Sequence, residues 1–273
     1  MTELNKTIIQ NLDVAAHFDP AMEIERRIQF LADYLRASGA RAYVLGISGG
    51  VDSLTAGLLA QAAVQRLRDQ GHEAQFFAMR LPYAAQADEQ DAQQAIDSIA
   101  PDHVITMNIQ TAADAVLQQL QSQAGDFVDP SRVDFHHGNI KARQRMIAQY
   151  ALAGSVGGLV IGTDHAAEAL MGFFTKFGDG AADVLPLAGL NKRRIRGIAS
   201  RLGAPQELVF KVPTADLESH RPLRPDEEAY GVSYDQIDDF LEGKDIDREA
   251  FERITEAYQR SMHKRALPVG PEN

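Results

Sequence analysis

The stretch "YVLGISGGVDSLTAG", residues 43–57, sets an apolar run directly before a glycine turn and a helical pattern. The run over Ala42–Ile47 predicts a buried strand, and apolar residues that recur from Leu54 onward predict a helix ending near Gly71. A second apolar run, over residues 74–81, predicts the next strand. A strand, a helix and a strand in so short a length form a βαβ unit, which joins two parallel strands by a right-handed crossover.

The same alternation continues along the chain. We expect helices over residues 19–39, 87–100, 111–123 and 139–154, and further strands over 103–109 and 158–163. This order predicts a single α/β domain over residues 1–273, with a doubly wound, mainly parallel sheet flanked by helices, as in Rossmann-like folds. Ligands are then expected at the carboxyl ends of the strands.

The composition narrows the classes of function. Of the 273 residues, 45% are hydrophobic and 24% are charged, as in ordinary globular proteins. The net charge of −11 disfavours a protein whose main task is to bind nucleic acid. The absence of cysteine excludes disulfides, thiolate-ligated metals and thiol nucleophiles. We find no signal peptide pattern or membrane-spanning run, and therefore expect a cytoplasmic protein without a membrane partner.

The turn at Ser48–Ser53 lies where the first strand meets the first crossover helix. Its glycines let an anion approach the N–H groups of the helix start, and its serines add hydroxyl donors, so the turn suits a phosphate. An aspartate beside a phosphate is repelled unless a divalent cation lies between them, so Asp52 indicates Mg²⁺. The spacing is neither GxxxxGK[ST] nor GxGxxG. The letters "SGG" alone fit a plain strand-to-helix turn equally well.

The full string "SGGVDS" is more specific and resembles the pyrophosphate loop of the ATP pyrophosphatase family. Further stretches resemble the ammonia-dependent NAD⁺ synthetases in matching order: "RLPYAAQADEQDAQ" from Arg80, "GNIKARQRMIAQY" from Gly138, "GTDHAAEALMGFFTKFGDGAADVLPL" from Gly162, "PTADLESHRPLRPDE" from Pro213 and "HKR" from His263. The resemblance covers most of the chain. It implies an adenine nucleotide alpha hydrolase-like fold and the amidation of deamido-NAD⁺ by ammonia, in which ATP and Mg²⁺ activate the nicotinate carboxylate as an acyl adenylate.

The resemblance also implies roles for individual residues. The implied ATP-binding residues are Gly46, Ile47, Ser48, Gly49, Gly50, Val51, Asp52, Ser53, Arg80, Thr163, Lys192 and Thr214. The implied deamido-NAD⁺ contacts are Arg143, Lys176, Asp183, His263 and Lys264. Asp52 and Glu168 match magnesium ligands, and Asp179 matches a ligand of a second ion. Asp52 and Lys192 are the implied catalytic groups, and we add the hypothesis that Asp183 accepts a proton from ammonium.

Each of these assignments has a simpler alternative. Arg143, in "KARQR", fits a solvated helix face. Lys192 fits a surface residue beside the helix cap Asn191, and Glu168 fits a helix start where an acid complements the dipole. The basic residues His263 and Lys264 near a helix carboxyl end need no ligand either.

The resemblance implies a homodimer with deamido-NAD⁺ bound at the subunit interface. Because glutamine-dependent versions of this chemistry use a cysteine nucleophile, the lack of cysteine predicts free ammonia as the substrate and no glutaminase domain. The polar stretch 214–231 is long and lacks periodicity, so we expect a lid that orders over the ATP site. The adjacent His136 and His137 are expected in a loop.

Three other functions remain compatible with the loop. The first is another synthetase of the same loop family with a different acceptor. The second is a tRNA-modifying adenylase, which the acidic charge and the absence of cysteine disfavour. The third is a non-catalytic ATP-binding module.

Overall fold

The computed structural model describes residues 2–84, 89–215 and 224–271. The helices are α1 Glu3–Asn11, α2 Pro20–Ser38, α3 Val51–Asp69, α4 Glu89–Ile99, α5 Gln110–Ala124, α6 Val133–Val156, α7 Ala166–Met171, α8 Lys192–Arg201, α9 Gln206–Val209, α10 Asp226–Tyr230, α11 Tyr234–Leu241, α12 Arg248–Arg260 and α13 Met262–Arg265. The strands are β1 Ala42–Gly46, β2 Gln75–Arg80, β3 His103–Thr106, β4 Gly158–Val160, β5 Thr214–Ala215 and β6 Arg224–Pro225.

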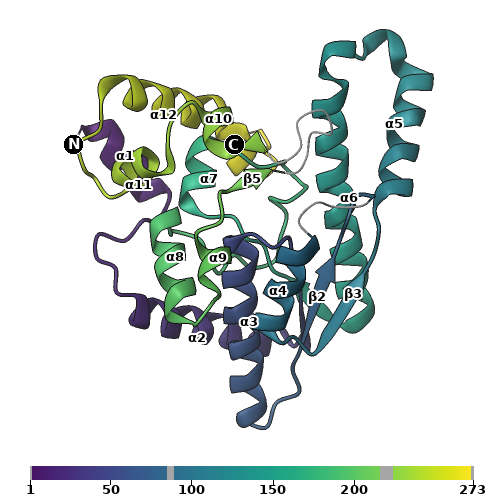
Figure 1. Cartoon of the computed structure of the whole chain (residues 1–273), viewed down its shortest axis with the longest axis vertical. Coiled ribbons are helices and arrows are strands. Elements are labelled where there is room, and N and C mark those ends of the chain that lie inside the picture. Colours follow the sequence, from purple (N-terminus) through teal and green to yellow (C-terminus); the bar gives the residue numbers. More distant parts are fainter. Residues whose placement is uncertain (1, 85–88, 216–223, 272–273) are drawn as a thin grey trace.

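A parallel sheet with the strand order β3-β2-β1-β4 forms the centre of the fold (Figure 1). The chain adds β2 and β3 on one side of β1 and then returns to place β4 on the other side. The strand order therefore reverses between β1 and β4, and the loops that follow these two strands diverge there. Such a switch point is where open α/β sheets bind ligands.

The two faces of the sheet belong to different hydrophobic clusters. Along β1, Tyr43 and Leu45 pack with α2, α3 and α8, whereas the alternate residues Ala42 and Val44 pack with α6. Successive side chains of a strand point to opposite faces, so the alternation puts helices on both sides of the sheet. The prediction of a doubly wound, mainly parallel α/β fold is confirmed.

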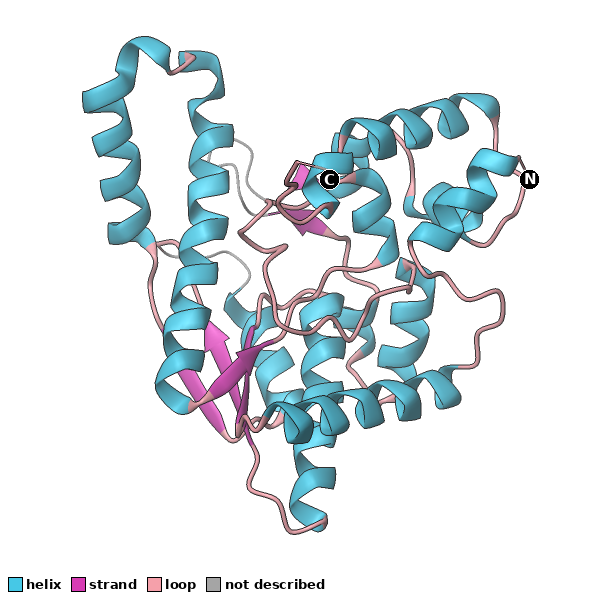
Figure 2. Ribbon diagram, turned by 180° about the vertical axis from the view of Figure 1, so that it is seen from behind, coloured by secondary structure: helices cyan, strands magenta, loops and turns pink. Residues whose placement is uncertain are grey.

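Two parts of the chain extend from this core. Helices α5 and α6 stand side by side and project beyond the rest of the molecule (Figures 1 and 2). A third cluster packs α7, α10, α11 and α12 around residues such as Leu170, Ile237 and Ile254. Figure 1 shows α11 and α12 of this cluster beside α1, away from α5 and α6. No described helix has the length and apolar character to cross a membrane.

Several boundaries differ from the sequence-based expectations. Helix α6 begins at Val133, so His136 and His137 are helical and the loop prediction for them is wrong. His137 packs edge-on against Tyr83 and is buried, which shows that tertiary contacts extend this helix. The ends of the expected lid form the β5–β6 pair and α10, while residues 216–223 lie outside the described residues.

Candidate functional site

The glycine turn after β1 forms an open cradle at the start of α3. Gly49 has a φ of +84°, a conformation that favours glycine. Gly50 caps α3 without a side-chain hydrogen bond, so N–H groups of the first turn stay available for an anion. Ser53 Oγ accepts a hydrogen bond from the Ser48 N–H at 3.2 Å and donates one to the Gly50 carbonyl at 3.1 Å, which closes the turn.

The cradle opens into a cavity of about 390 Å³ at the switch point of the sheet. The predicted residues that line it are Gly46, Ile47, Ser48, Gly50, Val51, Asp52, Ser53, Thr163, Glu168, Asp179, Thr214 and Lys264. They come from the end of β1, the turn after it and the start of α3, from the loop after β4, from α7 and the loop after it, from β5 and from α13. A cavity of this size with convergent polar groups is typical of a small-molecule site.

A buried ion pair lies under the cavity. Lys192, the first residue of α8, is 1% exposed, and its Nζ lies 2.8 Å from Asp52 Oδ2. Burial alone would raise the pKa of the Asp52 carboxyl, but Lys192, together with His165 and Arg196, outweighs burial, and the pKa lies below the ordinary value. Burial would likewise lower the pKa of Lys192, but Asp52 and Glu168 hold it above the ordinary value. Both groups are therefore charged near neutral pH, and the surface alternative for Lys192 is wrong.

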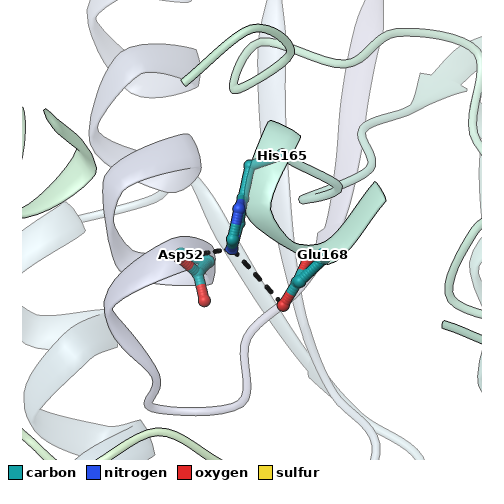
Figure 3. Close-up of side chains that lie close together, drawn as sticks. All are labelled: Asp52, His165 and Glu168. Atoms are coloured by element: carbon teal, nitrogen blue, oxygen red, sulfur yellow. Dashed lines mark ion pairs between the residues drawn. The ribbon is translucent and has the colours of Figure 1, made fainter. Parts of the chain in front are cut away.

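Beside the ion pair, the Asp52 carboxylate lies close to Glu168 and His165 (Figure 3). One ligand atom from each of the three residues can be chosen so that all lie within 4.8 Å of one another. Among the described residues, Asp52 Oδ1 has no hydrogen-bond partner. A buried carboxylate oxygen that lacks a donor, beside a second carboxylate, fits a hard divalent cation such as Mg²⁺.

Further acidic groups surround this end of the cavity. Burial raises the pKa of Asp164 well above its ordinary value, and the charges of Glu168 and Asp179 act in the same direction. Burial also raises the pKa of Asp179, although its Oδ1 accepts a hydrogen bond of 3.0 Å from the Thr175 N–H. The accumulation of acids indicates a place that binds positive charge.

Asp226 lines the cavity from the start of α10. It is 6% exposed, its Oδ2 accepts a hydrogen bond of 2.9 Å from the Tyr234 hydroxyl, and Oδ1 has no partner among the described residues. Burial raises the pKa of the Asp226 carboxyl to about 6. The Tyr234 ring in turn lies under Lys192 Nζ, 4.8 Å from the ring centroid, so α10 and α11 complete the surroundings of the ion pair.

Asp226→Asn is expected to stabilise the metal-free protein at pH 8. The pKa of Asp226 is higher in the folded protein than the value of about 4 in the unfolded chain. Between these two pH values the folded state binds more protons than the unfolded state, so ionisation of Asp226 lowers the unfolding free energy as the pH rises. The variant should gain about 2 kcal/mol in unfolding free energy at pH 8 and almost nothing near pH 4. Urea unfolding at both pH values measures this. The control Asp247→Asn removes an N-cap carboxylate whose pKa is lowered, so it should lose stability at pH 8.

Other predicted residues lie outside the lining of this cavity. Arg80 is 5% exposed and forms a two-pronged ion pair with Glu89 of α4. Asp183 Oδ2 accepts a hydrogen bond of 2.7 Å from the Val160 N–H at the end of β4, and its other oxygen lies 3.4 Å from the Tyr150 hydroxyl. Its assignment as a proton acceptor stays a prediction.

Apart from Asp183, the predicted deamido-NAD⁺ residues form a row beside the cavity. Arg143 on α6 donates to the Lys176 carbonyl at 3.2 Å, and Lys176 Nζ donates to the His263 carbonyl at 2.5 Å. Lys264 Nζ donates to the carbonyls of Gly172 and Phe174 at 2.9 and 2.8 Å. The row joins α6, the loop after α7 and α13, and its member Lys264 lines the same cavity as the glycine turn.

Three residues of the site were not among the predicted ligands. His165 precedes Glu168 by one helical turn, and this spacing could have placed both on one face of α7. Asp164 adjoins the predicted Thr163. No sequence pattern distinguishes Asp226 as a site residue, because it belongs to an acidic run at the start of a helix, where acids are common without a ligand.

Comparison with known proteins adds an independent finding. A family model described as NAD synthase matches residues 23–268. An NH(3)-dependent NAD(+) synthetase of Burkholderia cenocepacia is 62% identical over 263 residues, covering 96% of this chain and 93% of the relative. The solved NAD+ synthetase of Burkholderia pseudomallei is 57% identical with a TM-score of 0.83, covering 97% and 96% of the two chains. The solved NMN synthetase of Francisella tularensis is 37% identical with a TM-score of 0.81, covering 94% and 100%.

Proposed function

The chain belongs to the NAD synthase family, and on that premise we propose how its residues perform the reaction. It is an ammonia-dependent NAD⁺ synthetase, a ligase that amidates deamido-NAD⁺ with ATP and releases AMP and pyrophosphate. The observation that carries this conclusion is the high identity to a curated synthetase along almost the whole of both chains. We further propose that the chain acts as a single synthetase unit that takes free ammonia.

The chemistry proceeds in two displacements. A nicotinate carboxylate oxygen attacks the α-phosphorus of ATP, the new P–O bond forms, and the bond to pyrophosphate breaks. The lone pair of ammonia then forms a C–N bond at the carboxyl carbon, and the C–O bond to AMP breaks as the nitrogen loses a proton. Both steps move negative charge onto phosphate oxygens, so fixed donors and cations near the phosphates lower the barriers.

We assign the ATP phosphates to the cradle Gly46–Ser53. The open N–H groups at the start of α3 support this assignment, with Thr163, Thr214 and Arg80 as further contacts. Asp52 and Glu168 would hold Mg²⁺, which when bound neutralises phosphate charge, and Asp179 would serve a second ion. Lys192 would keep Asp52 ionised and correctly placed.

The acceptor nucleotide is assigned to the row beside the cavity. The cations Arg143, Lys176 and Lys264 and the exposed His263 suit the pyrophosphate of deamido-NAD⁺, and Asp183 lies at the end of β4 near Tyr150. Arg143 and His263 are exposed, which suits completion of the row by a second subunit.

A homodimer is the quaternary structure that we propose. Exposed large apolar side chains gather on β3, on the projecting pair α5–α6 and on the segments joined to them: Val104, Ile105, Met107, Val116, Leu120, Phe127, Phe135 and Ile147. The edge strand β3 is exposed along its whole length. Exposed large apolar side chains on neighbouring elements are typical of protein interfaces, and an edge strand has a free side that can pair with a partner.

Charge on α5 is expected to dissociate this dimer. Val116 and Leu120 are 44% and 39% exposed and stand one helical turn apart. The double variant Val116→Glu/Leu120→Glu should sediment as a monomer and lose affinity for deamido-NAD⁺, with unchanged circular dichroism. Phe210→Glu, at a 61% exposed site after α9, is the matched control and should remain dimeric. A wild-type monomer at assay concentration would refute the proposal.

A direct assay tests the activity and the acceptor. The full chain is incubated with ATP, Mg²⁺ and ammonia, and with either deamido-NAD⁺ or nicotinate mononucleotide, while amidated product, AMP and pyrophosphate are measured. We expect equal amounts of NAD⁺, AMP and pyrophosphate with deamido-NAD⁺. The mononucleotide is included because an NMN synthetase is among the structural neighbours. Amidation of the mononucleotide alone would reassign the acceptor, and failure of both substrates to react would refute the activity.

A further inference from the structure

His165 occupies the space between the two carboxylates assigned to Mg²⁺ (Figure 3). Its Nε2 lies 3.6 Å from Asp52 Oδ1 and 3.4 Å from Glu168 Oε1. The residue is 1% exposed, and neither ring nitrogen has a hydrogen-bond partner within the described parts of the chain. Leaving a buried polar ring unpaired costs free energy, so its placement here needs an explanation.

The charges around His165 supply that explanation. Asp52 and Glu168 repel each other across a short gap, and among the described residues the ion-pair partner of Lys192 is Oδ2 of Asp52. For the Glu168 carboxylate, His165 is the only ion-pair partner within the described residues. Nε2 faces one oxygen of each carboxylate at ion-pair distance, without hydrogen-bond geometry to either. It can therefore hold both oxygens at a short separation before any ion arrives.

The backbone keeps the ring in this position. His165 is the N-cap residue of α7, where its carbonyl accepts a hydrogen bond of 2.9 Å from the Ala169 N–H. The next N–H, of Ala166, donates to the Leu190 carbonyl at 2.8 Å. Leu190 lies just before α8, so the same contact ties His165 to the helix that carries Lys192.

We propose that His165 is a positioning residue whose Nε2 lies between Asp52 and Glu168, attracts both carboxylates electrostatically and so sets the spacing of the oxygens assigned to the metal. The inference rests on the proposed magnesium role of these two acids. The ring itself touches neither the ion nor the substrates. Outer partners of this kind commonly change metal affinity by about 10- to 100-fold when they are removed.

Three substitutions distinguish a role of the His165 N–H group from a role of the ring in packing. His165→Gln can place an amide N–H where Nε2 lies, His165→Asn can place one only near Nδ1, and His165→Met fills the volume without a donor. The full chain is titrated with Mn²⁺ alone, without ATP, and free Mn²⁺ is followed by electron paramagnetic resonance. We expect the Gln variant to bind almost as tightly as the wild type, and the Asn and Met variants to bind about 10- to 100-fold more weakly.

His137 offers the matched control. It is 7% exposed and its Nε2 lies 3.2 Å from the Asp114 carboxylate, but it belongs to α6. His137→Gln and His137→Met should leave Mn²⁺ binding unchanged, and thermal unfolding should show that every variant is folded. The proposed role of His165 would be wrong if all three His165 variants bound Mn²⁺ as tightly as the wild type, or if all three lost Mn²⁺ affinity equally. A direct nitrogen coupling to Mn²⁺ in pulsed spectra of the wild type would also contradict it.

The same titration distinguishes the two proposals. If the wild type makes NAD⁺ and binds Mn²⁺ while the His165 variants behave like it, only the positioning role fails. If the wild type binds no Mn²⁺, the assignment of the metal to Asp52 and Glu168 fails first.

Discussion

Asp52→Asn is expected to lower the rate of NAD⁺ formation by about 10³-fold, because it removes an anionic ligand of the proposed metal at the point where phosphate charge develops. The amide has the same shape as the carboxylate but leaves Lys192, which is 1% exposed, without its counter-charge. Breaking a buried pair in this way should also cost about 3 kcal/mol of unfolding free energy. Steady-state kinetics at saturating Mg²⁺ and urea unfolding measure the two effects.

A double variant separates catalysis from stability. Asp52→Asn/Lys192→Met removes both charges, so it should recover most of the lost stability but none of the activity. Activity of Asp52→Asn within tenfold of the wild type would contradict the metal assignment. If the double variant did not recover the stability lost in Asp52→Asn, the proposed contribution of the ion pair to the unfolding free energy would be wrong.

Gly49→Ala is expected to reduce kcat/KM for ATP by about 100-fold, because a displacement of about 1 Å in a positioning loop has effects of this size. The new Cβ would lie 2.7 Å from the Ala92 nitrogen and 2.9 Å from the Asp91 carbonyl carbon, both in the backbone of α4. A helix backbone cannot move aside cheaply, so the glycine turn assigned to the ATP phosphates must shift instead. ATP kinetics and binding of an ATP analogue measure the loss.

Gly71→Ala is the matched control. Gly71 has a φ of +83°, almost the same as the +84° of Gly49, but a Cβ there would meet nothing within 4 Å. This variant should show only the backbone strain of about 1–2 kcal/mol in its unfolding free energy and unchanged ATP kinetics. Similar ATP kinetics in the two variants would show that contact with α4 does not fix the loop.

The fold was predictable because its signals are local. Asp19 caps α2, Gly39 ends it in the left-handed conformation, and the apolar run of β1 is buried, all within a few residues of the pattern that predicted them. The start of α6 was not predictable in this way. The letters "VDFHHG" combine weak helix formers with a glycine, and the helix gains its first turns by packing His137 against Tyr83.

The site was predictable by resemblance but its electrostatics were not. Lys192 stands in "NKRR", which alone fits a solvated helix start. Its burial follows from Asp52 on α3 and Tyr234 on α11, which are remote in sequence. The contact of His165 with Asp52 depends in the same way on where α7 lies relative to α3, which no local pattern specifies.

The site lies across a seam between two hydrophobic clusters. Helices α3 and α8, which carry Asp52 and Lys192, pack in the cluster on one face of the sheet, whereas α7, which carries Glu168, packs with the C-terminal helices. A ligand that contacts residues of both clusters therefore links two separately packed parts of the protein. Local opening along the seam should dominate amide hydrogen exchange of α7 in the free protein, and bound nucleotide and metal should suppress that opening by the free energy of their binding.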